Sequence, residues 1–253
     1  MPMMSGSRAY RNGRTWVLSA LVVCLGAACS STPPYFGLTA SQLLEYSQEA
    51  FDREDWDEAV TALERLVQGA PGFDQMAEAR MLLAQAYLNK GDFITANSEF
   101  VRFSSTYPTH ELMTDAALGL CRSHSRLSPI LDRDQQYTVQ ALSSCQAVTL
   151  DYPGTQEAAE ADSIRTVMVE KLAWKDVNRG EFYFRRSLLD SGLIYFEQAL
   201  EDYPDTTAAP AALLFIYRTY QRLEYEEEAT EARQRLLDRY PDSPEAEEVR
   251  DVG

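Results

Sequence analysis

Prolines at regular intervals restrict the folds open to this chain. Five of the eleven prolines recur in this way, and four of these five follow a tyrosine. The pairs are Ala70-Pro71, Tyr107-Pro108, Tyr152-Pro153, Tyr203-Pro204 and Tyr240-Pro241. The intervals between these prolines are 37, 45, 51 and 37 residues. Proline cannot continue a helix, and it moves the residue before it out of the α region. The recurrence therefore predicts an internal repeat that closes with the end of a helix.

A small residue lies twelve positions before each proline: Ala59, Ala96, Ala141, Gly192 and Ala229. A small side chain three turns upstream of a helix end lets a second helix approach closely. In the second unit, Tyr87 falls on a first helix, Gly91 and Asp92 form a turn, and Phe100 falls on a second helix. This pattern resembles the tetratricopeptide repeat, a helix-turn-helix unit of about 34 residues.

The sequence predicts an all-α protein, a right-handed α-solenoid of five tetratricopeptide-like helix pairs with a C-terminal capping helix. We expect the repeats at residues 39–72, 73–109, 110–154, 155–205 and 206–242. Residues 243–250 are expected to be the cap, because their acidic side chains would give the last repeat a polar outer face. Side-chain oxygens expected to cap helix N-termini belong to Thr39, Asp55, Asp74, Asp92, Thr155, Thr206 and Ser243.

Two irregularities interrupt the repeat. Residues 128–134 lengthen the turn of the third unit, and insertions of this kind fall in surface loops. Residues 156–186 contain no proline, and Gly180 is their only helix breaker. We therefore expect either one long helix there or two nearly continuous ones.

The first 28 residues have the features of a bacterial lipoprotein signal peptide. Arginines come first, residues 16–25 are apolar but too few to span a bilayer, and Cys29 follows three small residues. This resemblance implies lipidation of Cys29, with residues 29–38 as a tether. Ordinary secretion with cleavage after Ala28 is the alternative, since Gly26 replaces the usual leucine. Ser30 and Ser31 lack the aspartate of inner-membrane retention, which favours the outer membrane.

Charge and motif content argue against several functions. The chain has 23 basic and 39 acidic residues, a formal charge of -16, so it is unsuited to binding nucleic-acid phosphates. It has two histidines, His110 and His124, no metal-ligand spacing, no phosphate-binding glycine loop and no nucleophile elbow. We expect no enzyme activity, metal or cofactor, and a helix-start role for His110.

Two pairs of residues leave alternatives open. Cys121 and Cys145 fall in the two helices of one repeat, where an oxidising periplasm would permit a disulfide. Two unbonded, small buried residues are the simpler interpretation, and we favour it.

Arg185 and Arg186 follow the run Phe182, Tyr183, Phe184, which cannot all face one side of a helix. A solvated arginine pair is the simpler interpretation, and a protein interface is the alternative.

Taken together, these features resemble BamD-type lipoproteins of the outer-membrane β-barrel assembly machine. The most specific segments are Tyr107-Pro108-Thr109-His110, Asp132-Arg133-Asp134 and Asp202-Tyr203-Pro204-Asp205-Thr206. The resemblance implies a non-enzymatic scaffold on the periplasmic face of the outer membrane. Its C-terminal repeats would bind a POTRA domain of the barrel subunit BamA. Its N-terminal repeats would receive signal strands of unfolded outer-membrane proteins, with other assembly lipoproteins as further partners.

The resemblance also assigns site residues. Phe182, Phe184, Arg185 and Arg186 would bind the partner, with Arg186 where the family carries a basic residue. Gln68 and Ala70 would belong to the substrate groove, although the family's Asn-Arg-Tyr-Pro reads Gln68-Gly69-Ala70-Pro71 here and lacks its aromatic.

Other envelope scaffolds are the alternatives. One is a cell-wall and division coordinator of the CpoB type, which carries a coiled coil that the short tether has no room for. Another is a lipoprotein scaffold for secretion or motility.

Overall fold

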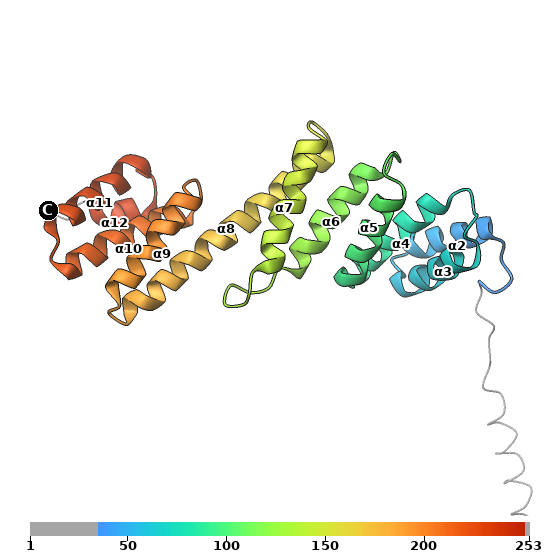
Figure 1. The fold of residues 1–253 in the computed structure, drawn as a ribbon, viewed down its shortest axis with the longest axis horizontal. Helices are drawn as coiled ribbons and strands as arrows, with labels where there is room; N and C mark the ends of the chain where they lie inside the picture. The colour runs from blue at the N-terminus through green and yellow to red at the C-terminus, as the bar shows by residue number, and fades with distance from the viewer. Residues whose placement is uncertain (1–34, 251–253) are drawn as a thin grey trace, which may run out of the picture. The chain divides into compact units, whose positions relative to one another are not determined.

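The computed structural model describes residues 35–250, and the chain divides after Leu38 into two units. The signal peptide and Cys29 lie outside the described residues. Within residues 35–250 there are eleven helices and no strand (Figure 1), so the prediction of an all-α protein is confirmed. The helices are α2 (Ala40–Asp52), α3 (Trp56–Gly69), α4 (Met76–Lys90), α5 (Phe93–Thr106), α6 (Met113–Leu127), α7 (Gln136–Asp151), α8 (Gln156–Arg185), α9 (Leu189–Asp202), α10 (Ala208–Leu223), α11 (Glu226–Arg239) and α12 (Pro244–Arg250).

The helices after Leu38 stack as an α-solenoid does. Each helix from α2 to α11 packs against the next one in the chain, and α2, α4, α6, α8 and α10 also contact one another in succession. The short α12 packs on α10 and α11. Each pair can bury its apolar side only against its neighbours, which is the property of a repeat array. We propose that these five pairs are the repeats and that α12 is the cap.

Most of the expected helix starts are capped as the sequence predicted. Thr39 and Gln42 form a reciprocal capping box at the start of α2. Backbone N–H groups of the first turn also donate to the side chains of Asp55, Asp92, Thr155 and Ser243. These bonds satisfy donors that a helix start leaves without intrahelical partners.

Two predicted caps are wrong. Asp74 does not cap α4, whose flanking residue is Gln75 and which has no side-chain cap. Thr206 does not cap α10, since the residue that flanks this helix is Thr207; the Thr206 hydroxyl donates to the Tyr203 carbonyl at 2.7 Å. A carboxylate from α8 replaces it: the Thr207 N–H donates to Glu170 Oε1 at 2.7 Å. A single sequence does not reveal a cap supplied by a residue 37 positions earlier.

The small residues before the prolines are buried. Ala59, Ala96 and Ala141 have no exposed surface, Ala229 is 6% exposed, and Gly192 is also buried. Gly192 marks a close helix contact, since a Cβ there would lie 3.2 Å from the Gly180 carbonyl oxygen of α8. The small residues found twelve positions before the prolines therefore lie where helices pack closely against each other.

Helix α8 is one continuous helix of 30 residues, so the long-helix alternative is correct. Gly180 lies inside α8 and does not break it. A Cβ at Gly180 would overlap the ring of Phe196, which is completely buried on α9. One part of α8 joins a core cluster through Ala161, and a later part joins a second cluster through Ala173 and Val177. The helix therefore connects two cores.

We predict that Gly180→Ala lowers the free energy of unfolding by about 1–3 kcal/mol or more, because the added methyl overpacks the contact with Phe196. Gly69→Ala is the matched control: Gly69 is also helical, and a Cβ there meets nothing within 4 Å. Its effect should be neutral or stabilising by less than about 1 kcal/mol. Thermal and urea melts measure both, and equal melting points would contradict the α8–α9 contact.

Candidate partner-binding site

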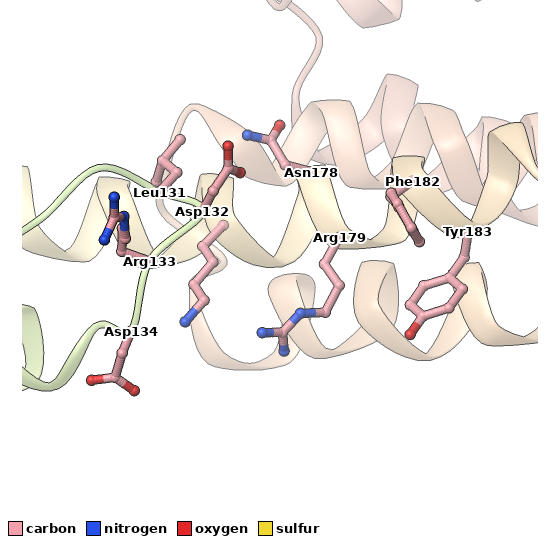
Figure 2. A pocket seen from close by; sticks show the side chains of 9 residues that line it. Leu131, Asp132, Arg133, Asp134, Asn178, Arg179, Phe182 and Tyr183 are labelled. Carbon is pink, nitrogen blue, oxygen red and sulfur yellow. The ribbon is translucent and has the colours of Figure 1, made fainter.

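A cleft of about 540 Å³ lies between the loop after α6 and the later part of α8 (Figure 2). The loop contributes Leu131, Asp132, Arg133 and Asp134, and α8 contributes Lys175, Asn178, Arg179, Phe182 and Tyr183. The loop was noted in the sequence as an insertion with a family-specific motif, and the aromatic run as a candidate interface. The structure brings part of each to the walls of one cleft.

Buried Gln135 holds the loop in place. Gln135 is only 4% exposed, and its Nε2 donates to the carbonyl oxygens of Ile130 at 2.9 Å and Arg133 at 3.0 Å. Carbonyl groups inside a loop need such partners because they have none in a helix or sheet. The amide therefore fixes the backbone on both sides of Asp132.

A chain of hydrogen bonds connects Gln135 to α8. Thr138 Oγ1 donates to Gln135 Oε1 at 2.6 Å, and the Thr138 and Ser128 hydroxyls lie 2.6 Å apart. Lys171 Nζ donates to Ser128 Oγ at 2.7 Å. Because Thr138 gives its single hydroxyl proton to Gln135, the Ser128 hydroxyl must donate to Thr138, and the donor and acceptor of each bond are therefore defined. Burial lowers the pKa of Lys171. Sequence reasoning missed this network, because its members are ordinary polar residues in separate elements.

The aromatic run faces three directions. Phe182 is 48% exposed and lines the cleft. Tyr183 stacks on Tyr195 of α9 with centroids 5.5 Å apart, and Phe184 packs edge-on against Phe215 of α10 at 5.6 Å. Successive helical residues are rotated by about 100°, so this division follows from the geometry. Phe182 therefore reaches the surface, whereas Phe184 points inward and packs against α10.

The two arginines after the run differ in their surroundings. The Arg186 guanidinium carbon lies 3.5 Å from the centroid of the Phe182 ring, and its Nη1 donates to the Phe182 carbonyl at 3.2 Å. Arg185 has a 73% exposed side chain and pairs with Glu181 one turn earlier. We call the exposed group Phe182, Arg185 and Arg186 the α8-end surface.

Helix α10 fixes the end of α8. Arg222 Nη1 donates to the Phe184 carbonyl at 3.1 Å, and its Nη2 donates to Ser187 Oγ at 3.0 Å. The guanidinium carbon also lies 4.7 Å from the centroid of the Phe184 ring. Cations near a helix C-terminus satisfy its free carbonyls and oppose its dipole. Arg222 was not among the predicted site residues, and no local sequence signal points to it.

The predicted substrate-groove residues lie elsewhere in the chain. Gln68 is exposed near the end of α3, and Ala70 is the half-buried residue that follows this helix. Neither lines the cleft described above.

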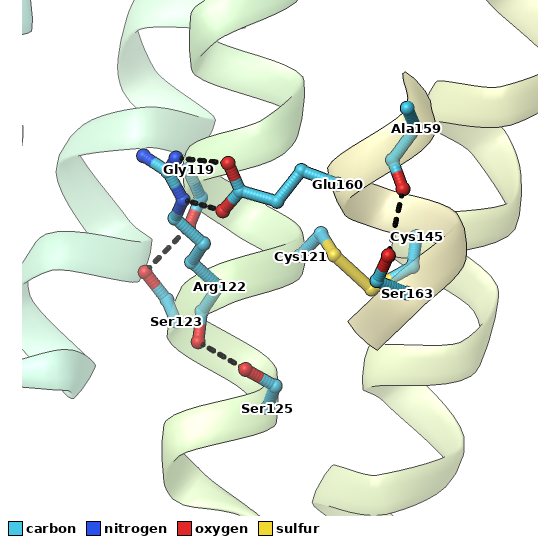
Figure 3. A network of polar contacts seen from close by, with 9 residues as sticks. All are labelled: Gly119, Cys121, Arg122, Ser123, Ser125, Cys145, Ala159, Glu160 and Ser163. Carbon is cyan, nitrogen blue, oxygen red and sulfur yellow. Dashed lines mark hydrogen bonds and ion pairs between the residues drawn. A yellow bond between two sulfur atoms is a disulfide. The ribbon is translucent and has the colours of Figure 1, made fainter. Parts of the chain in front are cut away.

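Cys121 of α6 and Cys145 of α7 are joined by a disulfide (Figure 3). The interpretation that we favoured, two unbonded residues, therefore does not match the structure. Their Cα atoms are 4.7 Å apart, within the range of about 4.4–6.8 Å that a disulfide needs. Both residues are completely buried, as the favoured interpretation required. The sequence did not show that their two helix positions face each other.

A bidentate ion pair ties α6 to α8 beside the disulfide. Arg122 Nε and Nη2 each donate to one carboxylate oxygen of Glu160 at 2.6 Å, as Figure 3 shows. The guanidinium lowers the pKa of the Glu160 carboxyl. Both side chains are about two-fifths exposed, so the pair adds geometric definition more than stability. Together, the disulfide and the ion pair link α6 to both following helices.

Both histidines form hydrogen bonds within the fold. Nδ1 of His110 accepts the Leu112 N–H at 3.2 Å just before α6, which matches the expected helix-start role. His124 lies between Asn97 and Ser144, and burial lowers its pKa.

Residues 35–250 hold no group of three or more metal-ligating side chains. None of the helices in this part of the chain is long and apolar enough to cross a membrane.

Stacked helix pairs with an open cleft and an exposed arginine–aromatic pair give this chain the architecture of a helical repeat scaffold. Residues 37–236 match the family model described as YfiO, outer membrane lipoprotein, and the chain belongs to this family. The resemblance stated from the sequence is thereby confirmed.

Named relatives agree with this family. The chain is 24% identical to the outer membrane protein assembly factor BamD of Caulobacter vibrioides, over 90% of this chain and 74% of that protein. It is 25% identical to the BamD of Vibrio cholerae, over 80% of this chain and 89% of that protein. Among solved structures, the tetratricopeptide-repeat domain of P58(IPK) is similar at 18% identity and a TM-score of 0.43, covering 82% of this chain and 53% of that one.

We predict that Gln135→Ala lowers the free energy of unfolding by about 1–3 kcal/mol, because two loop carbonyl groups lose their donor and the buried Thr138 hydroxyl loses its acceptor. Gln136→Ala is the matched control: the neighbouring glutamine is exposed, and its change should stay within about half a kcal/mol. Urea unfolding measures both variants. Equal midpoints would contradict the role given to Gln135.

Proposed function

We propose that this protein is a non-enzymatic scaffold subunit of the machine that assembles β-barrel proteins in the outer membrane. Its relatives are named outer membrane protein assembly factors, and its family is described as outer membrane lipoproteins. In this proposal the protein docks a POTRA domain of a BamA-like barrel subunit through the α8-end surface.

The observation that carries the docking proposal is the exposed pair of Arg186 and Phe182. The two side chains contact each other at 3.5 Å and are already ordered on the surface. Arginine and aromatic residues dominate protein interfaces because they bury large areas and make directional contacts. Pre-ordering also lowers the entropy lost on binding. Arg185 supplies a second cation at the same helix end.

A lipid on Cys29 would hold the protein on the periplasmic face of the outer membrane. The signal-like residues 1–28 and the family description support this anchor. Residues 29–38 would then be the tether between the lipid and the first repeat.

Two further partners rest on the family resemblance alone. Unfolded outer-membrane protein substrates would contact the first repeat near Gln68 and Ala70, and other assembly lipoproteins would bind the scaffold. The exposure of Gln68 is compatible with a contact there. Ala70 offers no aromatic side chain, so substrate binding at this place would be weaker than a tyrosine would give.

We predict that Cys29→Ser releases the protein into the soluble periplasmic fraction. One acyl chain binds a membrane only marginally, but several make the attachment durable, so the thioether-linked lipid would be the main anchor. Fractionation followed by a salt wash measures this. A variant that stays with the outer membrane after the wash would rule out the lipid as the main anchor.

We predict that Arg186→Glu folds with the helicity of the wild type but no longer co-purifies with the barrel subunit. Truncating one partner of a buried interfacial charge pair costs about 2–5 kcal/mol, and reversing the charge adds repulsion. Arg239→Glu is the control, because Arg239 also ends a helix and lies over a ring, that of Tyr240 at 5.6 Å. Gln68→Ala should likewise retain the subunit. Retention by Arg186→Glu would refute the docking role.

A further inference from the structure

The cleft gathers positive charge in an acidic chain. Two of the three lysines of the whole sequence, Lys171 and Lys175, lie on α8, and Arg179 follows one turn after Lys175. Arg133 adds a third cation to the cleft from the loop. Helix α8 as a whole is not basic, since it also carries six acidic residues, so the positive charge is local to the part of α8 that lines the cleft.

These cleft cations form no close ion pair, although the charges of Arg179 and Lys175 act on the Asp176 carboxyl and partly oppose the rise that burial causes in its pKa. The ion pairs among residues 35–250 include none made by Arg133, Lys175 or Arg179. Lys171, by contrast, is engaged by Ser128. Arg179 leans over the Tyr195 ring at 5.0 Å, a contact that orients a guanidinium without neutralising it. Three charged groups therefore line the cleft without a close ion-pair partner, and a ligand carboxylate can approach them.

The two walls of the cleft differ in charge. The helix wall carries Lys175 and Arg179, whereas the loop wall carries Asp132 and Asp134 on either side of Arg133. Asp134 is partly engaged, since its carboxylate accepts the Gln136 N–H at 2.9 Å. An anionic ligand would therefore lie against the helix wall and be repelled by the two aspartates. This arrangement would fix the side of the cleft that the ligand occupies.

Aromatic side chains border the cations. Arg179, Phe182 and Tyr183 all line the cleft from α8, as Figure 2 shows. Phe182 is half exposed, and Leu131 lines the cleft from the loop. Carboxylates would thus meet cations at one end of the cleft, and an apolar side chain would meet aromatic rings at the other. Exposed Asn178 offers both a donor and an acceptor to a peptide backbone.

We propose that the cleft binds an extended acidic segment of a partner protein, with carboxylates on Lys175, Arg179 and Arg133 and an apolar side chain against Phe182 and Tyr183. This site adds to the proposed POTRA docking and shares only Phe182 with the α8-end surface. The proposed occupant is defined by its chemistry, an extended peptide segment with carboxylates, because the cations of the cleft recognise that charge.

The test uses the Cys29→Ser chain, purified without detergent, and the dye-labelled peptide Glu-Glu-Trp-Glu-Glu in fluorescence anisotropy. The acidic peptide should bind and Lys-Lys-Trp-Lys-Lys should not. Binding should weaken steeply with salt, because the Debye length falls from about 10 Å at 0.1 M to about 3 Å at 1 M. Binding of the basic peptide in preference to the acidic one would overturn the proposal.

Charge reversal in the cleft should weaken binding of the acidic peptide at least about tenfold in Arg179→Glu. Arg126→Glu is the matched control: Arg126 is also exposed and lies over a ring, that of Phe93 at 4.9 Å, but it is not in this cleft. The control should bind like the parent chain. Equal binding by the two variants would contradict the proposal.

Two checks complete the test. If circular dichroism shows that Arg179→Glu is misfolded, Lys175→Gln replaces it and should still weaken binding, while Asp132→Asn should leave it equal or tighter. Vesicles containing phosphatidylglycerol are the second probe. Arg179-dependent binding to the vesicles without binding of the acidic peptide would overturn the proposal in favour of a lipid surface. Neither readout needs the barrel subunit, so a failure here is separate from a failure of POTRA docking.

Discussion

The contact between α8 and α9 at Gly180 and Phe196 is the constraint on which the rest of the structure depends. The ring of Phe196 occupies the space that a Cβ of Gly180 would need, so α9 packs against α8 without breaking it. Glycine in a helix interior costs about 1 kcal/mol relative to alanine, and the buried ring offsets that cost. Because α8 stays continuous, one helix serves two core clusters and carries both the cleft wall and the α8-end surface.

The candidate site is built from surface side chains that contacts within the fold hold in place. The chain of hydrogen bonds from Lys171 to Gln135 sets the loop against α8, and Arg222 of α10 fixes the end of the same helix. Arg186 and Phe182 then contact each other on the surface. Ordered side chains lose less entropy on binding than mobile ones, so such a surface is suited to a partner protein.

Local chemistry made much of the fold predictable. Proline positions marked the helix ends, and capping residues such as Thr39 and Asp92 marked helix starts, because both effects act within a few residues. The aromatic and arginine residues of α8 were also named from sequence. The cap from Glu170, the facing positions of the two bonded cysteines and the network around Gln135 were missed. The cap, the disulfide and the bond from Lys171 to Ser128 join residues far apart in the chain that only packing brings together, whereas the bonds of Gln135 itself are local but follow no standard turn or cap pattern.

Hydrogen–deuterium exchange of the Cys29→Ser chain, with and without the purified POTRA region of its barrel subunit, tests the central claim most directly. The account predicts slower exchange of the amides at the end of α8 and in the turn to α9, residues 180–190. Amides of α3 around Gln68 should exchange at an unchanged rate. Protection confined to α2 and α3, or no protection at saturating POTRA concentrations, would contradict the claim that the end of α8 docks this partner.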